Sequence, residues 1–217
     1  KSSHSFPTRR SSDLLQPVNL KDSAFLNILK EINPDVIVVI AFRMLPESVW
    51  RIPSKGTINL HASLLPQYRG AAPINWALIN GETRTGLTTF FINESIDTGD
   101  IIMQEATEIA EEDNFETLHD RLREMGKTVI LKTLDMIESG SAKAIAQNSL
   151  IVENKPAPKL NKENTRIDWR RNAKDLFNHI RGLSPFPGAW TTLVDKDGNE
   201  QLLKISESHP VTAESGS

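Results

Sequence analysis

Asn59 and His61 are the two residues of this 217-residue chain whose types and spacing most directly suggest catalysis. They lie in Thr57-Ile-Asn-Leu-His61, which alternates polar and apolar residues as a strand does. A period of two places both side chains on one face, about 6.5 to 7 Å apart along the strand. An amide can donate a hydrogen bond to a developing oxyanion, and an imidazole exchanges protons near neutral pH. A strand histidine can equally be structural, so the pair alone assigns no function.

Two further segments combine polar residues with loop character. In Asp97-Thr-Gly-Asp100 the residue types suit a tight turn, and Ser63-Leu-Leu-Pro66 also has the composition of a loop. The chain contains no cysteine, and its five histidines include no pair at metal-ligand spacing. We therefore expect neither a thiolate nucleophile nor a metal site.

Helices and strands alternate along the part of the chain that must position these residues. Apolar spacing and capping residues predict helices over 25–32, 46–50, 73–80, 113–140 and 172–181, the fourth opened by an Asp113/Glu116 capping box. Strands are expected over 35–42, 57–62, 85–93, 101–109, 189–194 and 202–205. The unbroken apolar run at 35–42 is typical of a buried parallel strand. The order predicts an α/β fold.

Composition divides the chain into segments. Residues 1–14 resemble a translated sequencing-library adapter, so we interpret them as non-native and exclude them from the fold. Residues 15–141 form the α/β unit, the polar segment 142–160 is expected to be an extended linker, and a second module occupies 161–217. The longest apolar run, 36–42, is too short to span a membrane, and the formal net charge is −3. We expect a protein that is not membrane-bound.

The motifs together resemble the folate-dependent formyltransferases. The resemblance rests on Asn59-Leu-His61, on the following Ala-Ser-Leu-Leu-Pro-Gln-Tyr-Arg-Gly-Ala-Ala-Pro73, and on Asp97-Thr-Gly-Asp100. Within the family, Arg69-Gly-Ala-Ala-Pro-Ile, Arg166-Ile-Asp-Trp169 and Pro185-Phe-Pro187 resemble the branch that acts on initiator tRNA. The likeness runs from about Leu15 to Ile205.

The resemblance implies a Rossmann-like, mostly parallel sheet whose first strands are missing, followed by a truncated OB-like β-barrel domain. The implied reaction moves a formyl group from 10-formyltetrahydrofolate to the α-amino group of methionyl-tRNA. Asn59 would stabilise the oxyanion, His61 would act as general base and then general acid, and Asp97 would orient His61 or stabilise its charge. Asp100 would hold the turn. Ser63, Leu64, Leu65 and Pro66 would lie along the folate. No metal is required.

A group of basic residues near the linker could contact tRNA phosphates. It comprises Lys155, Lys159, Lys162, Arg166, Arg170 and Arg171. A solvated linker explains the same charges equally well. The expected partner is initiator methionyl-tRNA, and the expected state is a cytoplasmic monomer.

Two other functions remain open. A sister enzyme could use the same donor on an amino-sugar nucleotide or on glycinamide ribonucleotide, although a basic linker and an OB-like module suit an RNA acceptor better. A noncatalytic RNA-binding module is the other alternative, against which Asn59, His61 and Asp97 together argue.

The missing opening strands would leave an apolar sheet edge, from which we expect poor solubility or aggregation. Arg43, where relatives often carry a smaller residue, has no assigned role.

Overall fold

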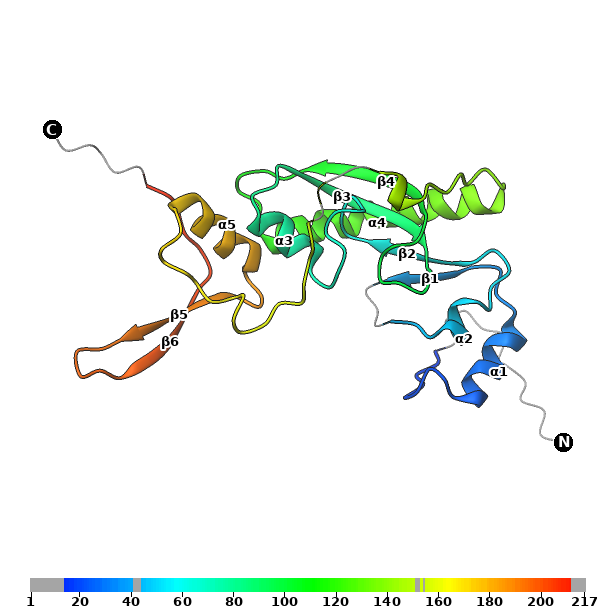
Figure 1. Cartoon of the computed structure of the whole chain (residues 1–217), viewed down its shortest axis with the longest axis horizontal. Coiled ribbons are helices and arrows are strands. Elements are labelled where there is room, and N and C mark those ends of the chain that lie inside the picture. The colour runs from blue at the N-terminus through cyan, green and yellow to red at the C-terminus, as the bar shows by residue number, and fades with distance from the viewer. Residues whose placement is uncertain (1–13, 41–43, 151–152, 154, 212–217) are drawn as a thin grey trace.

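The computed structural model describes residues 14–40, 44–150, 153 and 155–211 (Figure 1). Arg43 and most of the suspected adapter segment therefore lie outside the described residues. In Figure 1 helices α1 (Ser23–Ile32) and α2 (Glu47–Trp50) lie at one end of the molecule, and the hairpin of β5 (Ala189–Val194) and β6 (Glu200–Ile205) lies at the other. The strands β2, β3 and β4 lie between these ends.

A four-stranded sheet forms the centre of the described chain. Its order is β1 (Ile37–Ile40), β2 (Thr57–His61), β3 (Arg84–Phe91), β4 (Ile101–Glu108). β1 and β2 are parallel, whereas β2 with β3 and β3 with β4 are antiparallel. The α/β class is confirmed, but the described sheet is mixed rather than mostly parallel. The short connection from β3 to β4 explains part of this difference, because a short loop can join only antiparallel neighbours.

Helix α4 (Phe115–Glu138) covers one face of this sheet. Its buried Leu118, Leu122 and Val129 pack with Leu60 and Leu87 of the sheet. A Cβ on Gly126 would lie 3.1 Å from the Leu60 side chain, so the helix approaches the sheet closely at this point. The described helices include none with the length and apolar character needed to cross a membrane.

The start of α4 differs from the expected capping box. Asn114 is the N-cap: its side chain accepts a hydrogen bond from the Thr117 backbone amide, and its own backbone amide donates to the Thr117 hydroxyl. Asp113 instead accepts from the Ala110 amide, from the Thr117 hydroxyl and from Arg121 Nη2, the last at 2.6 Å. The predicted cap, Asp113, was wrong by one residue. Its carboxylate forms an ion pair with Arg121 instead of capping the helix.

Most described residues of the segment after α4 are exposed, as its polar composition suggests, but the segment is attached to the first module at particular points. Ile145 pairs with Ile101 at the start of β4, and Ala157 forms a bridge with Gly70. Between them Gln147 opens the 3₁₀ turn η1 (Gln147–Ser149) and is buried. Long-range hydrogen bonds therefore fix a sequence that has no apolar periodicity.

Helix α5 (Ala173–Leu183) joins the second module to the first. It packs against α3 (Pro73–Ile79), where Ile79, Ile180 and Leu183 share a core. The β5–β6 hairpin follows with the predicted turn, and Gly198 adopts a positive φ of 84°. The described strands of this module form only this hairpin, so closure into an OB-like barrel stays a prediction.

β1 is an edge strand of the described sheet. Its Val38 and Ile40 are 36% and 58% exposed. Aggregation through this edge remains a prediction.

Candidate active site

Strand β2 presents Asn59 and His61 on the same face. The alternate residues, Ile58 and Leu60, pack on the side of α4, so Asn59 and His61 point to the opposite side. His61 is buried and Asn59 is half-buried. The Asn59 amide has no side-chain hydrogen bond to any residue that the structure describes, which leaves its N–H groups available to a ligand.

A backbone carbonyl fixes the imidazole of His61. Nε2 lies 2.8 Å from the carbonyl oxygen of Tyr68. Because a carbonyl can only accept, Nε2 must carry the hydrogen in this arrangement. Nδ1 is then the nitrogen that can accept a proton, and it lies 3.8 Å from Oδ2 of Asp97.

Asp97 reaches His61 through an unusual backbone conformation. Its φ is +54°, in the left-handed region that few non-glycine residues adopt. Its Oδ2 accepts a hydrogen bond from the Gly70 amide at 2.9 Å. Asp100, three residues on, is exposed and uses its backbone carbonyl to accept from Phe91. The structure thus brings Asp97 to His61, whereas Asp100 contacts the end of β3 through its backbone.

The loop between β2 and α3 forms the wall that carries the Tyr68 carbonyl. Thr88 of β3 donates to the carbonyl of Ser63 at 2.6 Å and accepts from the Leu65 amide at 3.1 Å. Ser63 and Leu65 are buried, so Leu64 and Pro66 are the candidate folate residues that keep partly exposed surface. The backbone groups that could recognise a pterin are thus largely bonded within the fold.

Tyr68, Glu82 and Lys155 form a bonded group behind this wall. Glu82 Oε1 accepts from the Tyr68 hydroxyl and from Lys155 Nζ, each at 2.6 Å. Burial alone would raise the pKa of Glu82, but the hydrogen bonds from Lys155 and Tyr68 lower it overall. Burial and the adjacent Glu82 raise the pKa of Tyr68. Lys155, expected to contact tRNA, is engaged by a carboxylate, and this bond raises its pKa.

The other basic candidates separate into two groups. Arg170 pairs with Asp168 at 2.8 Å and Arg171 with Asp175 at 3.5 Å. The remaining three have no ion pair among the described residues and lie near the side chain of Trp190. They are Lys159, Lys162 and Arg166, of which the last two stack over the ring of Trp190 at 5.4 and 5.5 Å.

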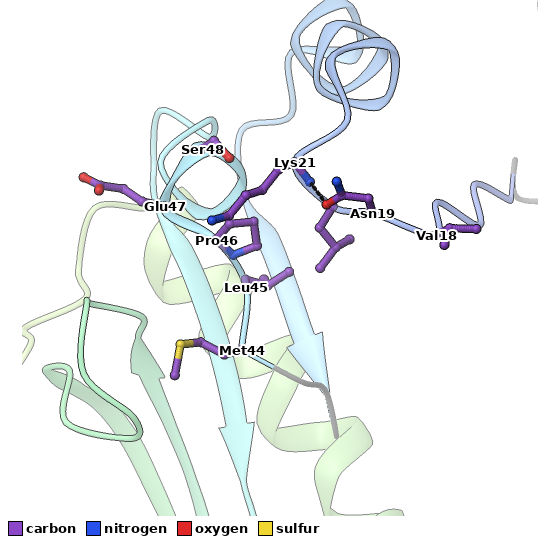
Figure 2. Close-up of a pocket in the computed structure, with 9 residues that line it drawn as sticks. Val18, Asn19, Lys21, Met44, Leu45, Pro46, Glu47 and Ser48 are labelled. Atoms are coloured by element: carbon purple, nitrogen blue, oxygen red, sulfur yellow. Dashed lines mark hydrogen bonds between the residues drawn. The ribbon is translucent and has the colours of Figure 1, made fainter.

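We compare two hollows in the described surface with the positions of the candidate residues. One, of about 590 Å³, is lined by Val18–Lys21 and Met44–Ser48 (Figure 2). It contains none of the candidate residues.

The second hollow, of about 620 Å³, adjoins the loop that contacts His61 and Asp97. Ala71 and Ala72 line it directly after Gly70, and the β5–β6 hairpin contributes Trp190 and Lys204. Lys159 and Lys162 also line it. Sequence reasoning missed Lys204, which has no neighbouring basic residue along the chain to reveal it.

Gln147 and Arg69 were also missed as site residues. Both lie next to Asp97, where the Gln147 amide donates to the Asp97 carbonyl and Arg69 donates to Gln147. Arg69 belongs to a quoted motif, but nothing local in the sequence distinguishes Gln147. The described residues include no group of three or more potential metal ligands.

Comparison with known proteins identifies relatives of both parts of the chain. Residues 2–134 match the family of formyl transferases, and residues 159–217 match the formyl transferase C-terminal domain. A methionyl-tRNA formyltransferase from Bacteroides thetaiotaomicron is 53% identical over 200 residues, which cover 91% of this chain and 62% of the relative. One from Flavobacterium johnsoniae is 54% identical over 198 residues, covering 90% and 61%. The chain therefore spans less than two thirds of the length of these relatives.

Solved structures share the fold at lower identity. A 4-N formyltransferase from Francisella tularensis superposes with a TM-score of 0.70 at 22% identity, covering 89% of this chain and 78% of that one. HypX from Aquifex aeolicus, solved with tetrahydrofolic acid, gives a TM-score of 0.65 at 23% identity, covering 81% and 30%. The matched family model spans more than half of the residues, and on that ground the chain belongs to the formyl transferase family.

Proposed function

We propose that this chain transfers the formyl group of 10-formyltetrahydrofolate to the α-amino group of methionine on initiator tRNA. One observation carries the proposal: His61 holds its Nε2 hydrogen on the Tyr68 carbonyl and turns Nδ1 towards the Asp97 carboxylate. The names of relatives that are more than half identical support methionyl-tRNA as the acceptor.

The polar groups suit the charges that such a transfer creates. The amine nitrogen attacks the formyl carbon, a C–N bond forms, and the carbonyl oxygen becomes an oxyanion. Asn59 can donate its amide hydrogen to that oxygen. His61 Nδ1 takes the proton that the amine loses, and the nearby Asp97 carboxylate stabilises the positive ring. His61 then returns the proton to the folate N10 as the bond from carbon to N10 breaks.

We propose that Leu64 and Pro66 form the part of the loop that faces the folate. They are half-buried, whereas Ser63 and Leu65 are buried and hold the loop against β3. Leu65 packs with Phe90 and Ile101.

We propose that the tRNA acceptor end lies over the hollow beside Trp190. Aromatic faces and nearby cations are the features that bind unpaired nucleotides. Lys159, Lys162 and Arg166 are the sequence candidates that fit this placement, because ion pairs hold Lys155, Arg170 and Arg171.

The chain contains no cysteine, which suits a reducing compartment, and we propose that it acts as a monomer in the cytoplasm.

A panel of acceptors tests this function. Formyl transfer from 10-formyltetrahydrofolate is measured with methionyl-tRNA, an amino-sugar nucleotide and glycinamide ribonucleotide, side by side. We expect transfer to methionyl-tRNA alone. Transfer to a small amine instead would establish the sister activity, and tRNA binding without any transfer would favour a noncatalytic module.

A further inference from the structure

Gln147 is a buried polar residue that the proposed mechanism does not use. Its side chain is only 3% exposed, although it belongs to the polar segment between the two modules. Ile145 and Ile101 exchange backbone hydrogen bonds of 2.8 Å, so the segment returns to the start of β4. This places Gln147 directly against the turn that carries Asp97.

The Gln147 amide is fully bonded, and each partner belongs to the candidate site or its turn. Oε1 accepts from Arg69 Nε at 3.0 Å and from Arg69 Nη2 at 2.6 Å. Nε2 donates to the carbonyl of Asp97 at 3.0 Å and to that of Gly99 at 2.7 Å. One side chain therefore ties the β2–α3 loop to the β3–β4 turn.

The β3–β4 turn needs contacts from outside the turn to stabilise its backbone conformation at Asp97. A left-handed φ of +54° is disfavoured for an aspartate, and this conformation directs the carboxylate to Gly70 and His61. The backbone carbonyl of that same residue accepts from Gln147. A hydrogen bond at this carbonyl constrains the peptide plane that follows Asp97, and it therefore favours the observed turn.

We propose that Gln147 is a positioning residue for formyl transfer, which together with Arg69 holds the Asp97 carboxylate against His61. The inference rests on the proposed roles of Asp97 and His61. The competing explanation is that Gln147 only fastens the segment between the modules. The two explanations differ in whether the effect of Gln147 passes through the Asp97 carboxylate.

Two substitutions separate these explanations. Gln147→Met has a similar length and can make none of the four hydrogen bonds. Gln147→Glu keeps an acceptor for Arg69 but cannot donate to the carbonyls of Asp97 and Gly99. The matched control is Ser149→Ala in the same 3₁₀ turn, because within the described part of the chain the Ser149 hydroxyl bonds only the nearby Ala146 carbonyl.

The kinetic expectation is a loss in kcat. Both Gln147 variants should lower kcat by about 10- to 100-fold, because small displacements of a catalytic group slow the chemical step. KM for donor and acceptor should change less than about threefold, since substrate-contacting groups are intact. Ser149→Ala should match the wild type. A rise in KM at unchanged kcat would overturn the proposal.

A double-variant cycle tests whether the effect passes through Asp97. In an Asp97→Asn background, Gln147→Met should cost less than about threefold further, because residues that act as a unit are not additive. Losses that multiply fully would show that Gln147 acts independently of the carboxylate, and the proposal would be wrong.

A spectroscopic measurement needs no substrate. The Gly70 amide donates to Asp97 Oδ2, whereas the neighbouring Ala71 amide donates to the Ala157 carbonyl at 2.8 Å. In ¹H–¹⁵N spectra both Gln147 variants should move the Gly70 amide proton towards its position in Asp97→Asn, with Ala71 unchanged. A fixed Gly70 signal, or equal movement of both, would contradict the proposal. This outcome is independent of which acceptor, if any, the wild type formylates.

Discussion

At the scale of single residues, the local environment decides which charges can serve a substrate. Lys155 and Lys162 look alike in the sequence, yet one bonds Glu82 and the other lies over the Trp190 ring. A cation already bonded to a carboxylate has less to gain from a phosphate. The distinction separates the six basic candidates into three with an ion pair and three with none among the described residues, and the latter three are those we propose for tRNA.

Lys162→Ala and Arg170→Ala test this separation directly. Removing Lys162 should raise KM for methionyl-tRNA about 3- to 10-fold with kcat unchanged, because one phosphate contact is lost. Arg170→Ala should change KM less than about twofold, since that guanidinium pairs with Asp168 and does not lie over the Trp190 ring. Steady-state kinetics at a fixed salt concentration provides both values. Equal effects of the two substitutions would refute the assignment.

Glu82→Gln tests the bonded group behind the active-site wall. Its folded pKa is depressed, so its ionisation stabilises the fold fully above the ordinary value of 4.5 and less as the pH falls through the folded pKa. The variant should unfold about 1 to 2 kcal/mol more easily at pH 7, and this deficit should shrink in acid. Urea unfolding at several pH values measures it.

The control for Glu82→Gln is Glu124→Gln, which removes an exposed partner of Lys127 on α4. We expect the free energy of unfolding of this variant to stay close to that of the wild type. A deficit for Glu82→Gln that stayed constant from pH 7 into acid would contradict the account.

At the scale of elements, local sequence pattern predicts the strands and helices, but it predicts only part of the candidate site. The strand period predicts that Asn59 and His61 share a face, because that period is a property of the backbone itself. The approach of Asp97 depends on a left-handed residue, and the place of Gln147 depends on contacts across 50 residues. No local pattern encodes these contacts.

The same limit applies to the start of α4. The sequence predicts a helix there correctly, but the choice of capping residue depends on Arg121, a full two turns later. Long-range partners therefore decide which of two neighbouring polar residues caps the helix.

Gly182→Ala probes the contact between α5 and α3. A Cβ at this position would lie 2.8 Å from Ile79 Cγ1 and 3.0 Å from the Ile79 amide nitrogen. Because backbone atoms cannot yield easily, the variant should lose about 1 to 3 kcal/mol of stability despite the better helix propensity of alanine. Lys174→Ala, on the exposed side of α5, should stay within about 0.5 kcal/mol of the wild type. Chemical unfolding distinguishes them, and equal stability would show that α5 is not packed as described.

At the scale of the whole molecule, α3 packs against both modules, from which we expect them to unfold together. Ala77 and Leu78 belong to the core shared with α4, while Ile79 belongs to the core shared with α5. A polar linker with independent domains on either side would show no such sharing. The second module therefore depends on the first for its packing.

Leu183→Ala tests this dependence. Leu183 is fully buried in the core with Ile79 and Ile180, so the variant should lose about 2 to 5 kcal/mol. Circular dichroism and tryptophan fluorescence should report one common transition that shifts as a whole. Separate transitions, with only one of them shifted, would show that the modules unfold independently.

The central claim is that His61, held between Tyr68 and Asp97, carries the proton from the attacking amine to the folate N10 in the proposed formylation of methionyl-tRNA. The most direct measurement is single-turnover transfer from 10-formyltetrahydrofolate to methionyl-tRNA by the wild type, His61→Ala and the exposed-histidine control His119→Ala. We predict that His61→Ala slows transfer by at least about 100-fold, while His119→Ala keeps the wild-type rate. Transfer by His61→Ala at the wild-type rate would contradict the account.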